Sequence, residues 1–402
     1  MTIKGPLNKV RVIDLSHAQA GPFGTQLLGN LGAEIIKIEP TEGDISRNII
    51  PKQGSESYYF LALNQNKKSV VLDLHTKSGK KAFYDLIKIS DVVYDNYRVG
   101  VKERLGADYE TLKNINPRII SCSITGFGPS GPYCHQPAFD DNIQGITGAI
   151  SLCGEPGSKP LRSSIGIVDI TAGILAALGV TAALYKREYT GKGYQVDINL
   201  LDTAFSLLQP QFQSYFITQK VPEPQGSRHP YMPLFGNFQT KDGYLILAPS
   251  WPHISLAINR ADLIDDPRFK TSEDRFAHKH ELDNIVEDTL RQKSSDYWLE
   301  IFRAKDIPVA PVNTLDKAMN DPQVIHNKII TNMTHPAYGK IRAIACPIHI
   351  EDTAGNPEPP PTLGQHTEEV LVELLGYTKE QVKEMTDEIK NYKKERRLRK
   401  QA

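Results

Sequence analysis

The feature that most constrains the fold of this chain is an alternation of short apolar runs with amphipathic segments of helical period. Residues 10–15 form an apolar run typical of a buried strand, residues 22–31 suit a helix, and residues 34–38 suit a second strand. The pattern recurs further along, with strands expected at residues 69–74, 92–94 and 118–124 and helices at residues 78–88 and 101–113. Because such alternation builds parallel sheets with right-handed crossovers, the sequence predicts an open, mostly parallel α/β sheet.

The carboxyl ends of the predicted strands carry polar residues that are candidates for a functional site. In an open parallel sheet, ligands bind beyond these ends. The residues expected there are His17, Gln19, Asn96, Tyr97, residues 126–128 and Asp169. We therefore expect these segments to converge at one end of the sheet.

The first predicted strand-to-helix turn differs from a dinucleotide-binding turn. Its glycines, Gly21 and Gly24, do not form the pattern GxGxxG, so we expect a Rossmann-like sheet without that phosphate-binding fingerprint. The helix begins just after His17 and Gln19, and the free backbone amides of its first turn are suited to an anion or a carbonyl oxygen.

A single carboxylate, Asp169, interrupts the most apolar stretch of the chain, residues 163–187. The pattern predicts a short strand before Asp169 and a buried helix of small residues after it. One interpretation is a helix cap, because acids are preferred there and free amides of the first turn lie close by. The other is a carboxylate nucleophile in a desolvated pocket. The local sequence leaves both interpretations open.

The length of 402 residues exceeds that of a usual single domain, so we expect two. Prolines and glycines in residues 221–233 predict a boundary. We expect a large domain of residues 1–220, which carries Asp169, with a return to it in residues 326–402, and a smaller α/β domain with its linkers in residues 221–325.

Further expected elements are a strand within residues 193–202, a helix from there to about residue 218, a hairpin turning at residues 241–243, helices at residues 281–291 and 295–305, a strand at residues 341–350 and a helix over residues 363–385.

The charge balance and the cysteines exclude several classes of function. Lys+Arg and Asp+Glu both number 47, which gives no electrostatic reason to expect nucleic acid as a partner, and the basic residues 393–400 are interpreted as a solvated helix end or tail. We expect no membrane span, since charged residues and glycine break the apolar run, and no metal site, since no ligand spacing such as HExxH occurs. Four scattered cysteines fit a reducing cytoplasm.

Several segments of the chain form, in order, a pattern that is specific as a whole. They are VRVIDLSHAQAGPFGTQLLGNLGAEIIKIEP, the pair Gly43–Asp44, NKKSVVLDL, DNY, SITGFGPSGPY, GIVDITAG, GKGYQVDINLLD and LGQHTEEVL. This pattern covers nearly the whole chain and resembles the class III CoA-transferases of the CaiB/BaiF type, the family of formyl-CoA transferase and carnitine CoA-transferase.

The resemblance implies an acyl-CoA:carboxylate CoA-transferase built as a homodimer of two interlocked rings, with acyl-CoA and a free carboxylic acid as substrates. In that family the carboxylate that matches Asp169 is the nucleophile. It attacks the donor thioester to give a mixed anhydride and CoA thiolate, and the thiolate returns to give an aspartyl-CoA thioester. The chemistry is sensible for a carboxylate, because a carboxylate is a good leaving group from an anhydride.

The same resemblance implies roles for further residues, each with a plain structural alternative. Gln19 matches a glutamine beside the thioester, although it also suits a hydrogen bond at the helix start. Asp140 follows the aromatic Phe139 and is a candidate to assist the active site, or is a surface acid. The CoA-binding set comprises His17, Leu72, Leu74, His75, Asn96, Tyr97, Arg104, Phe139 and Asp140. Without the resemblance, the leucines are strand core and Arg104 is a solvated helix residue.

Three departures from the family pattern leave the acyl group unassigned. Pro40 and His75 stand where formyl-CoA transferase has basic residues, so part of its phosphate contact set is missing. The glycine-rich lid of that enzyme would fall at residues 249–254, which here read PSWPHI. Either Trp251 and His253 shape a different lid or there is no equivalent.

Two alternatives to a CoA-transferase remain. α-Methylacyl-CoA racemases share the superfamily, but they need a second acid/base where this chain has Phe139, and His135 is the nearby candidate for that role. The other alternative is a CoA-binding homologue without catalysis, in which Asp169 is only a cap.

Overall fold

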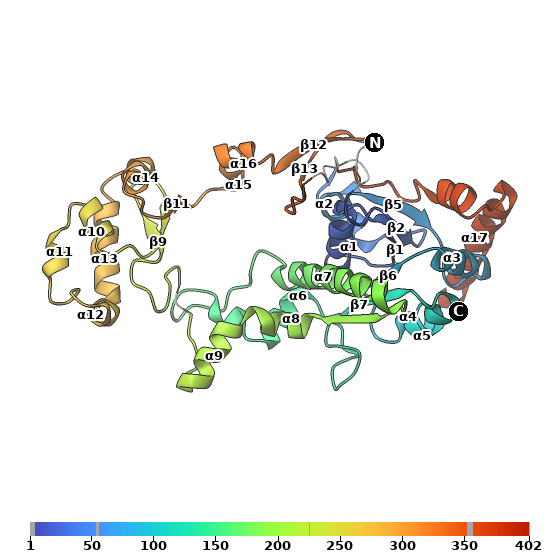
Figure 1. Ribbon diagram of the computed structural model, residues 1–402, viewed down its shortest axis with the longest axis horizontal. Helices are drawn as coiled ribbons and strands as arrows, with labels where there is room; N and C mark the ends of the chain where they lie inside the picture. The colour runs from blue at the N-terminus through green and yellow to red at the C-terminus, as the bar shows by residue number, and fades with distance from the viewer. Residues whose placement is uncertain (1–4, 54–55, 225, 352–356, 402) are drawn as a thin grey trace. The chain divides into compact units, whose positions relative to one another are not determined.

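The computed structural model describes residues 5–53, 56–224, 226–351 and 357–401 and divides into two compact units (Figure 1). Unit 1 consists of Met1–Thr147, Ser163–Pro210 and Asn327–Ala402, and unit 2 consists of Gly148–Arg162 and Gln211–His326. All the site residues expected from the sequence belong to unit 1, apart from the candidate lid.

Unit 1 is built on a six-stranded sheet in the order β5-β2-β1-β6-β7-β8, with every pair of neighbours parallel. The strands are β1 (Arg11–Asp14), β2 (Glu34–Glu39), β5 (Lys67–Val71), β6 (Val92–Asp95), β7 (Ile120–Thr125) and β8 (Gln195–Asn199). The prediction of an open parallel α/β sheet is therefore confirmed. Because all six strands run the same way, the segments that follow them leave the sheet at the same end.

Helices cover both faces of this sheet, because alternate side chains of each strand point to opposite sides. Val12 of β1 packs into one core with α1 (Ala20–Asn30), α6 (Asp140–Ile146), α7 (Ile167–Thr190) and α8 (Leu200–Leu207). The next residue, Ile13, packs into the other core with α3 (Lys77–Lys88), α4 (Val101–Leu105), α5 (Tyr109–Ile115) and α17 (Lys379–Gln401). The result is a three-layer α/β arrangement.

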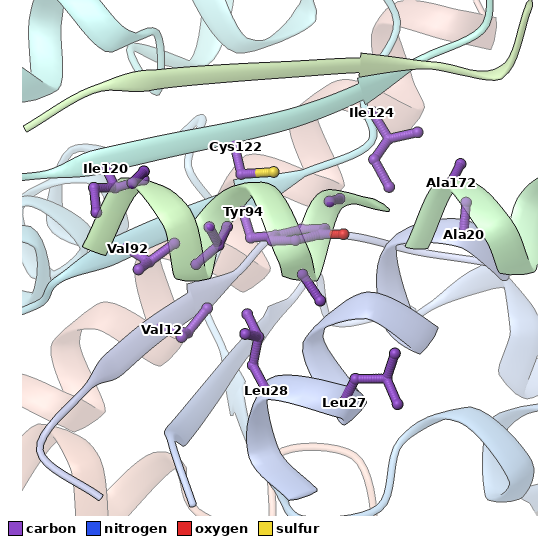
Figure 2. Close-up of a cluster of buried hydrophobic side chains, with 14 of the residues drawn as sticks. Val12, Ala20, Leu27, Leu28, Val92, Tyr94, Ile120, Cys122, Ile124 and Ala172 are labelled. Atoms are coloured by element: carbon purple, nitrogen blue, oxygen red, sulfur yellow. The ribbon is translucent and has the colours of Figure 1, made fainter. Parts of the chain in front are cut away.

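The first core contains a close crossing of α1 and α7 at two glycines. A Cβ atom on Gly173 would lie 2.6 Å from the backbone oxygen of Ala20, and one on Gly24 would lie 2.2 Å from the hydroxyl of Tyr94. Figure 2 shows Tyr94 among the labelled side chains of this core, with its hydroxyl directed toward Ala20 and Ala172. The backbones can approach this closely only because both positions lack a side chain.

The structure corrects three elements expected from the sequence. The strand predicted just before Asp169 is wrong, because α7 begins at Ile167 and the preceding residues are irregular. The helix predicted over residues 101–113 is two helices, α4 and α5, separated at Gly106, which adopts a φ of 69°. The helix expected up to residue 218 is likewise divided, into α8 and α9 (Gln209–Thr218).

Unit 1 also contains smaller elements and the C-terminal segment. Near the start lie the 3₁₀ helix η1 (Ile45–Asn48), the strand pair β3 (Lys52–Gln53) and β4 (Glu56–Ser57), and α2 (Tyr58–Leu63). The C-terminal part forms the antiparallel pair β12 (Ile330–His335) and β13 (Gly339–Ile344), the π-helix η3 (Glu369–Leu374) and α17. The helix predicted over residues 363–385 is thus two elements. The basic tail continues α17, but its side chains from residue 396 lie outside those described.

Unit 2 is a small α/β body around a three-stranded antiparallel sheet in the order β11-β10-β9. The predicted hairpin is confirmed, with β9 and β10 joined by residues 240–243. Its elements are η2 (Ile150–Leu152), β9 (Gly236–Gln239), β10 (Tyr244–Leu247), α10 (His253–Ala257), α11 (Asp262–Asp265), α12 (Ser272–Ala277), α13 (Lys279–Leu290), α14 (Ser295–Ala304), β11 (Val309–Pro311), α15 (Leu315–Ala318) and α16 (Pro322–His326).

By length and composition alone, α7 is the one helix in the described part of the chain that could cross a membrane. A single such helix is weak evidence, because the core helix of a globular unit has the same composition. One face of α7 packs into the core through Val168, Ala172, Ala176 and Val180. The burial of this face accounts for the apolar residues on it.

The glycine crossing predicts the effect of a single methyl group. Replacing Gly173 with alanine places a Cβ atom against backbone atoms of α1, which cannot move without shifting the helix. We expect Gly173→Ala to lower the free energy of unfolding by about 1–3 kcal/mol. Gly145→Ala in α6 is the control, because a Cβ atom there meets nothing within 4 Å. Urea unfolding compares the two, and equal stability of both variants would contradict the proposed constraint.

Candidate active site

The loops that follow β1 and β6 are joined side by side at the carboxyl end of the sheet. The backbone N–H of His17 donates to Oδ1 of Asn96 at 2.9 Å, and Nδ2 of Asn96 donates back to the carbonyl of His17 at 2.8 Å. The rings of His17 and Tyr97 lie 5.7 Å apart. Burial lowers the pKa of His17, which favours its neutral imidazole. Three of the expected site residues therefore form one cluster.

A buried ion pair fixes the residue that precedes Gln19. Ala18 adopts a φ of 64°, in the left-handed region that non-glycine residues rarely occupy. Its N–H donates to Oδ1 of Asp44 at 3.1 Å, and Oδ2 of Asp44 pairs with Lys37 at 2.9 Å. Burial by itself would raise the pKa of Asp44, but Lys37 and the backbone amides lower it below its usual range. The Lys37–Asp44 pair thus fixes the turn at Ala18, which determines the direction of the Gln19 side chain.

The side chain of Gln19 lies at the start of α7 and is oriented by a tyrosine. The hydroxyl of Tyr59 donates to Oε1 of Gln19 at 2.5 Å. The Gln19 amide also packs against Gly166, where a Cβ atom would lie 2.7 Å from Oε1. Although Gln19 is the N-cap residue of α1, its side chain makes no capping bond. Since Oε1 already accepts a hydrogen bond from Tyr59, the Nε2 group is the end left to donate to another partner.

Asp169 lies in the first turn of α7 but does not cap that helix. The N-cap residue is Gly166, and no side chain makes the usual capping bond there. The backbone N–H of Asp169 donates to Oδ2 of Asp140 at 2.8 Å, so Asp140 satisfies a free amide of the first turn. Within the described residues, no hydrogen bond reaches the carboxylate of Asp169. The interpretation of Asp169 as a cap therefore has no geometric support.

The surroundings of Asp169 disfavour its charged form. Burial, and then the negative charges of Asp140 and Asp141, raise the pKa of Asp169 to about 7. Tyr59 responds to the same surroundings, because burial and the Asp169 carboxylate raise the pKa of the phenol to about 12. Perturbed groups of this kind cluster at functional sites. Gln19, Tyr59, Asp140 and Asp169 together form a compact group, which we call the carboxylate cluster.

A second group of expected residues lines a cavity of about 240 Å³, which we call the β5 cavity. It lies over the ends of β1, β2, β5 and β6, and Tyr97 connects it to His17. Arg104, at its rim, is exposed and has no ion-pair partner among the described residues. The expected residues in its lining are Leu72, Leu74, His75, Tyr97 and Arg104.

Not every expected residue joins these two groups. Phe139 is 66% exposed and precedes α6 without lining the β5 cavity, whereas its neighbour Asp140 is buried against Asp169. The candidate lid belongs to unit 2, where the ring of Trp251 packs under the guanidinium of Arg275 at 5.1 Å and His253 opens α10. No group of three or more potential metal ligands occurs among the described residues.

Sequence reasoning missed two residues that shape the site. Tyr59 is one of 17 tyrosines and lies in an apolar helix, where no pattern distinguishes it from a core residue. The sequence did contain information that could have identified Asp44, since this residue forms part of the Gly43–Asp44 pair in the family pattern. Its position five residues after β2 also places it at the carboxyl end of the sheet.

Comparisons with known proteins agree on one family. The family model described as CoA-transferase family III matches residues 7–367. Succinyl-CoA:glutarate CoA-transferase of Mus musculus is 35% identical over 379 residues, which cover 92% of this chain and 87% of that protein. Acetyl-CoA:oxalate CoA-transferase of Acetobacter aceti is 37% identical over 326 residues, which cover 80% and 84%. The crystal structure of a CaiB/BaiF family protein from Brucella suis matches with a TM-score of 0.84 and 31% identity, covering 92% of this chain and all of that chain.

The charges beside Asp169 predict how its pKa responds to substitution. Asp140→Asn removes one negative charge while its side-chain oxygen can still accept the Asp169 N–H, so the pKa of Asp169 should fall below 7. Asp141→Asn should lower the pKa by less, because its charge contributes less. NMR of protein with ¹³C-labelled aspartate carboxyls, assigned with Asp169→Asn, measures these values. Titration of wild-type Asp169 near the ordinary pKa of about 4 would contradict the geometry.

Proposed function

The chain belongs to CoA-transferase family III, and from this membership we propose that it moves CoA between carboxylic acids in the cytoplasm through covalent intermediates on Asp169. The observation that carries the proposal is the carboxylate of Asp169. It is half-buried, its pKa is raised to about 7, and it lies at the helix start against which the Gln19 amide packs. A carboxylate with a raised pKa is more basic and hence a better nucleophile once it is deprotonated.

The first half of the reaction transfers CoA from the donor to the enzyme. An oxygen of the Asp169 carboxylate attacks the thioester carbon of the donor acyl-CoA, and the carbon–sulfur bond breaks. The products are a mixed anhydride on Asp169 and the CoA thiolate. The thiolate then attacks the aspartyl carbon of the anhydride, which releases the donor acid as its carboxylate and leaves an aspartyl-CoA thioester.

The second half repeats these steps with the acceptor acid. The acceptor carboxylate attacks the aspartyl carbon, forming a new anhydride and releasing the CoA thiolate. The thiolate then attacks the acyl carbon of the acceptor, which yields the new acyl-CoA and frees Asp169. No step needs a proton donor, since every nucleophile and leaving group is an anion. The sequence of steps therefore needs no second acid/base group beside Asp169.

Gln19 is suited to stabilise the oxyanions that form when each carbonyl carbon is attacked. Tyr59 occupies its Oε1, which leaves the Nε2 group as a donor beside the start of α7. The positive end of the α7 helix dipole adds to this effect. Fixed donors of this kind are typically worth about 10²–10³-fold in rate.

The β5 cavity is the proposed site for the nucleotide part of CoA. Leu72 and Leu74 offer an apolar floor for the adenine, and Arg104 offers an unpaired guanidinium for a phosphate. Asn96 and His17 lie on the path between this cavity and Gln19, which suits the pantetheine arm.

The racemase alternative gains no support from the site. Such an enzyme needs a second acid/base group opposite the aspartate. Phe139 carries no ionisable proton, and His135 is exposed. Proton abstraction is therefore not the reaction that these residues favour.

Short dicarboxylic acids are the first acceptors to test. The named relatives act on glutarate and oxalate, with succinyl-CoA and acetyl-CoA as donors. A scan of these two donors against dicarboxylic, hydroxy and betaine-type acids would assign the acyl group.

A homodimer is the proposed assembly. The face of α7 that turns away from the core is apolar yet exposed, through Ile174, Leu178, Tyr185 and Tyr189. An exposed stripe of this kind marks an interaction surface. The resemblance to a family of interlocked dimers makes a second copy of this chain its proposed occupant.

Trapping tests the covalent mechanism. Incubation with acyl-CoA and a carboxylic acid, followed by hydroxylamine, should convert Asp169 to its hydroxamate, detected by mass spectrometry of peptides. Asp169→Ala should lower the transfer rate by about 10⁴-fold or more. Asp288→Ala, at an exposed acid of unit 2, is the control. Full turnover by Asp169→Ala would refute the mechanism, and absence of any adduct or turnover in the wild type would favour a non-catalytic CoA-binding protein.

Light scattering tests the dimer. The wild type should elute with twice the mass of one chain, and Leu178→Asp combined with Tyr185→Asp should yield a folded monomer, because two charges cannot be buried unpaired in an apolar interface. Leu256→Asp, at an exposed apolar position of α10, should leave the dimer intact. A double variant that remains dimeric would contradict this assignment of the face.

A further inference from the structure

The C-terminal helix α17 is anchored beside the β5 cavity. Met385 and Ile389 pack into the same core as Leu72 and Leu74. Glu388 accepts hydrogen bonds from the backbone amides of Lys77, at 3.0 Å, and Ser78, at 3.1 Å, at the start of α3. The helix is therefore docked by both apolar and polar contacts, rather than lying free.

The next turn of α17 reaches a residue that lines the cavity. The ring of Tyr392 stacks on His75, with the centroids 5.8 Å apart and the planes inclined by 12°. Nδ1 of His75 lies 2.9 Å from Oδ1 of Asp73, which fixes the other side of the imidazole. Tyr392 and Asp73 thus hold His75 between them as one wall of the cavity.

The residue after Tyr392 brings a cation to the same region. Nζ of Lys393 pairs with the carboxylate of Glu42 at 2.5 Å. Glu42 follows Pro40, which lines the β5 cavity, and Thr41, which lines a neighbouring cavity of about 360 Å³ together with Lys393. Residues 40–41 therefore lie between Lys393 and the β5 cavity.

The charges in the cavity are too few for the ligand that it is proposed to hold. The nucleotide end of CoA carries a diphosphate and a 3′-phosphate. Among the described residues that line the β5 cavity, Arg104 carries the one permanent positive charge, His75 is engaged by Asp73, and Pro40 is neutral. A further cation has to come from an element outside the cavity lining.

The order of the strands decides which phosphate α17 can meet. The thioester of CoA must lie near Asp169, and Tyr97, after β6, leads from the β5 cavity toward Gln19 through His17. β5 is an edge strand of the sheet, and His75 follows it on the other side of the cavity. The end of CoA that lies farthest from the thioester therefore extends toward β5 and α17.

We propose that α17 completes the CoA site: Lys393 binds the 3′-phosphate of CoA, and Tyr392 positions His75 against the adenosine. The inference rests on the proposed function, because it requires CoA in the β5 cavity. Replacing Glu42 by a phosphate as the partner of Lys393 costs little free energy. The Glu42 side chain is 66% exposed and is solvated when it is released, and a phosphate offers more charge than a carboxylate.

Calorimetry with CoA and 3′-dephospho-CoA tests the inference without relying on turnover. The wild type should bind CoA more tightly than 3′-dephospho-CoA, and Lys393→Gln should lose about tenfold of that preference, the usual value of one charge-assisted hydrogen bond. Lys394→Gln makes the same charge change on the neighbouring, exposed position of α17 and should keep the preference. Tyr392→Ala should weaken binding of both nucleotides about threefold, and Tyr392→Phe should not.

The outcomes separate this inference from the proposed function. If the wild type prefers CoA and Lys393→Gln keeps the full preference, the role of Lys393 is refuted while CoA transfer stands. If Tyr392→Ala binds both nucleotides as the wild type does, the role of Tyr392 is refuted. If the wild type binds neither nucleotide, both the inference and the CoA site fail. Loss of the preference in Lys393→Gln with no transfer by the wild type would support the inference and the CoA site, and would refute the proposed transfer reaction.

Discussion

The close crossing of α1 and α7 is the constraint on which the site depends. With no side chain at Gly24 or Gly173, the two helices meet backbone to backbone, over the hydroxyl of Tyr94. Their N-termini are thereby brought together, so that the amide of Gln19 reaches the start of the helix that carries Asp169. A larger residue at either glycine would separate the helices and, with them, the Gln19 amide and the start of α7. The close packing of the two helices in the core and the geometry of the candidate site therefore depend on the same two glycines.

A second requirement is a network of buried charges below the site. Asp14 and Lys67 pair at 3.0 Å and Lys37 and Asp44 at 2.9 Å, all with side chains almost wholly removed from water. Ion pairs at such depth are costly to desolvate, so they contribute little net stability, but losing one partner leaves an uncompensated charge. The contribution of the network is to fix the positions of residues at the site. Through Asp44 it holds Ala18 in a left-handed conformation and so determines where Gln19 points.

The fold could be predicted from the sequence wherever an apolar period was regular, as in the six strands and the hairpin of unit 2. The prediction of a strand before Asp169 was wrong because the spacing of Ile165 and Ile167 resembles that of a buried strand. In the structure these side chains are 62% and 40% exposed, and tertiary contacts decide that α7 begins at Ile167. Asp169 and Gln19 could be selected as candidates because the family pattern includes them. Tyr59 could not, since its importance lies in one hydrogen bond to a residue 40 positions away.

Two acids at the start of α7, Asp140 and Asp169, are suited to different roles. A carboxylate that caps a helix is stabilised in its charged form, which lowers its pKa and makes it a poor nucleophile. Asp140 accepts the N–H of Asp169 and so satisfies one of the free amides in the first turn of α7. Its negative charge then acts on Asp169 in the opposite sense, since it helps burial to raise the pKa of that carboxyl to about 7. Asp140 thus satisfies an amide of the helix, and the Asp169 carboxylate is left with a raised pKa and with no hydrogen bond among the described residues, as the proposed attack on a thioester requires.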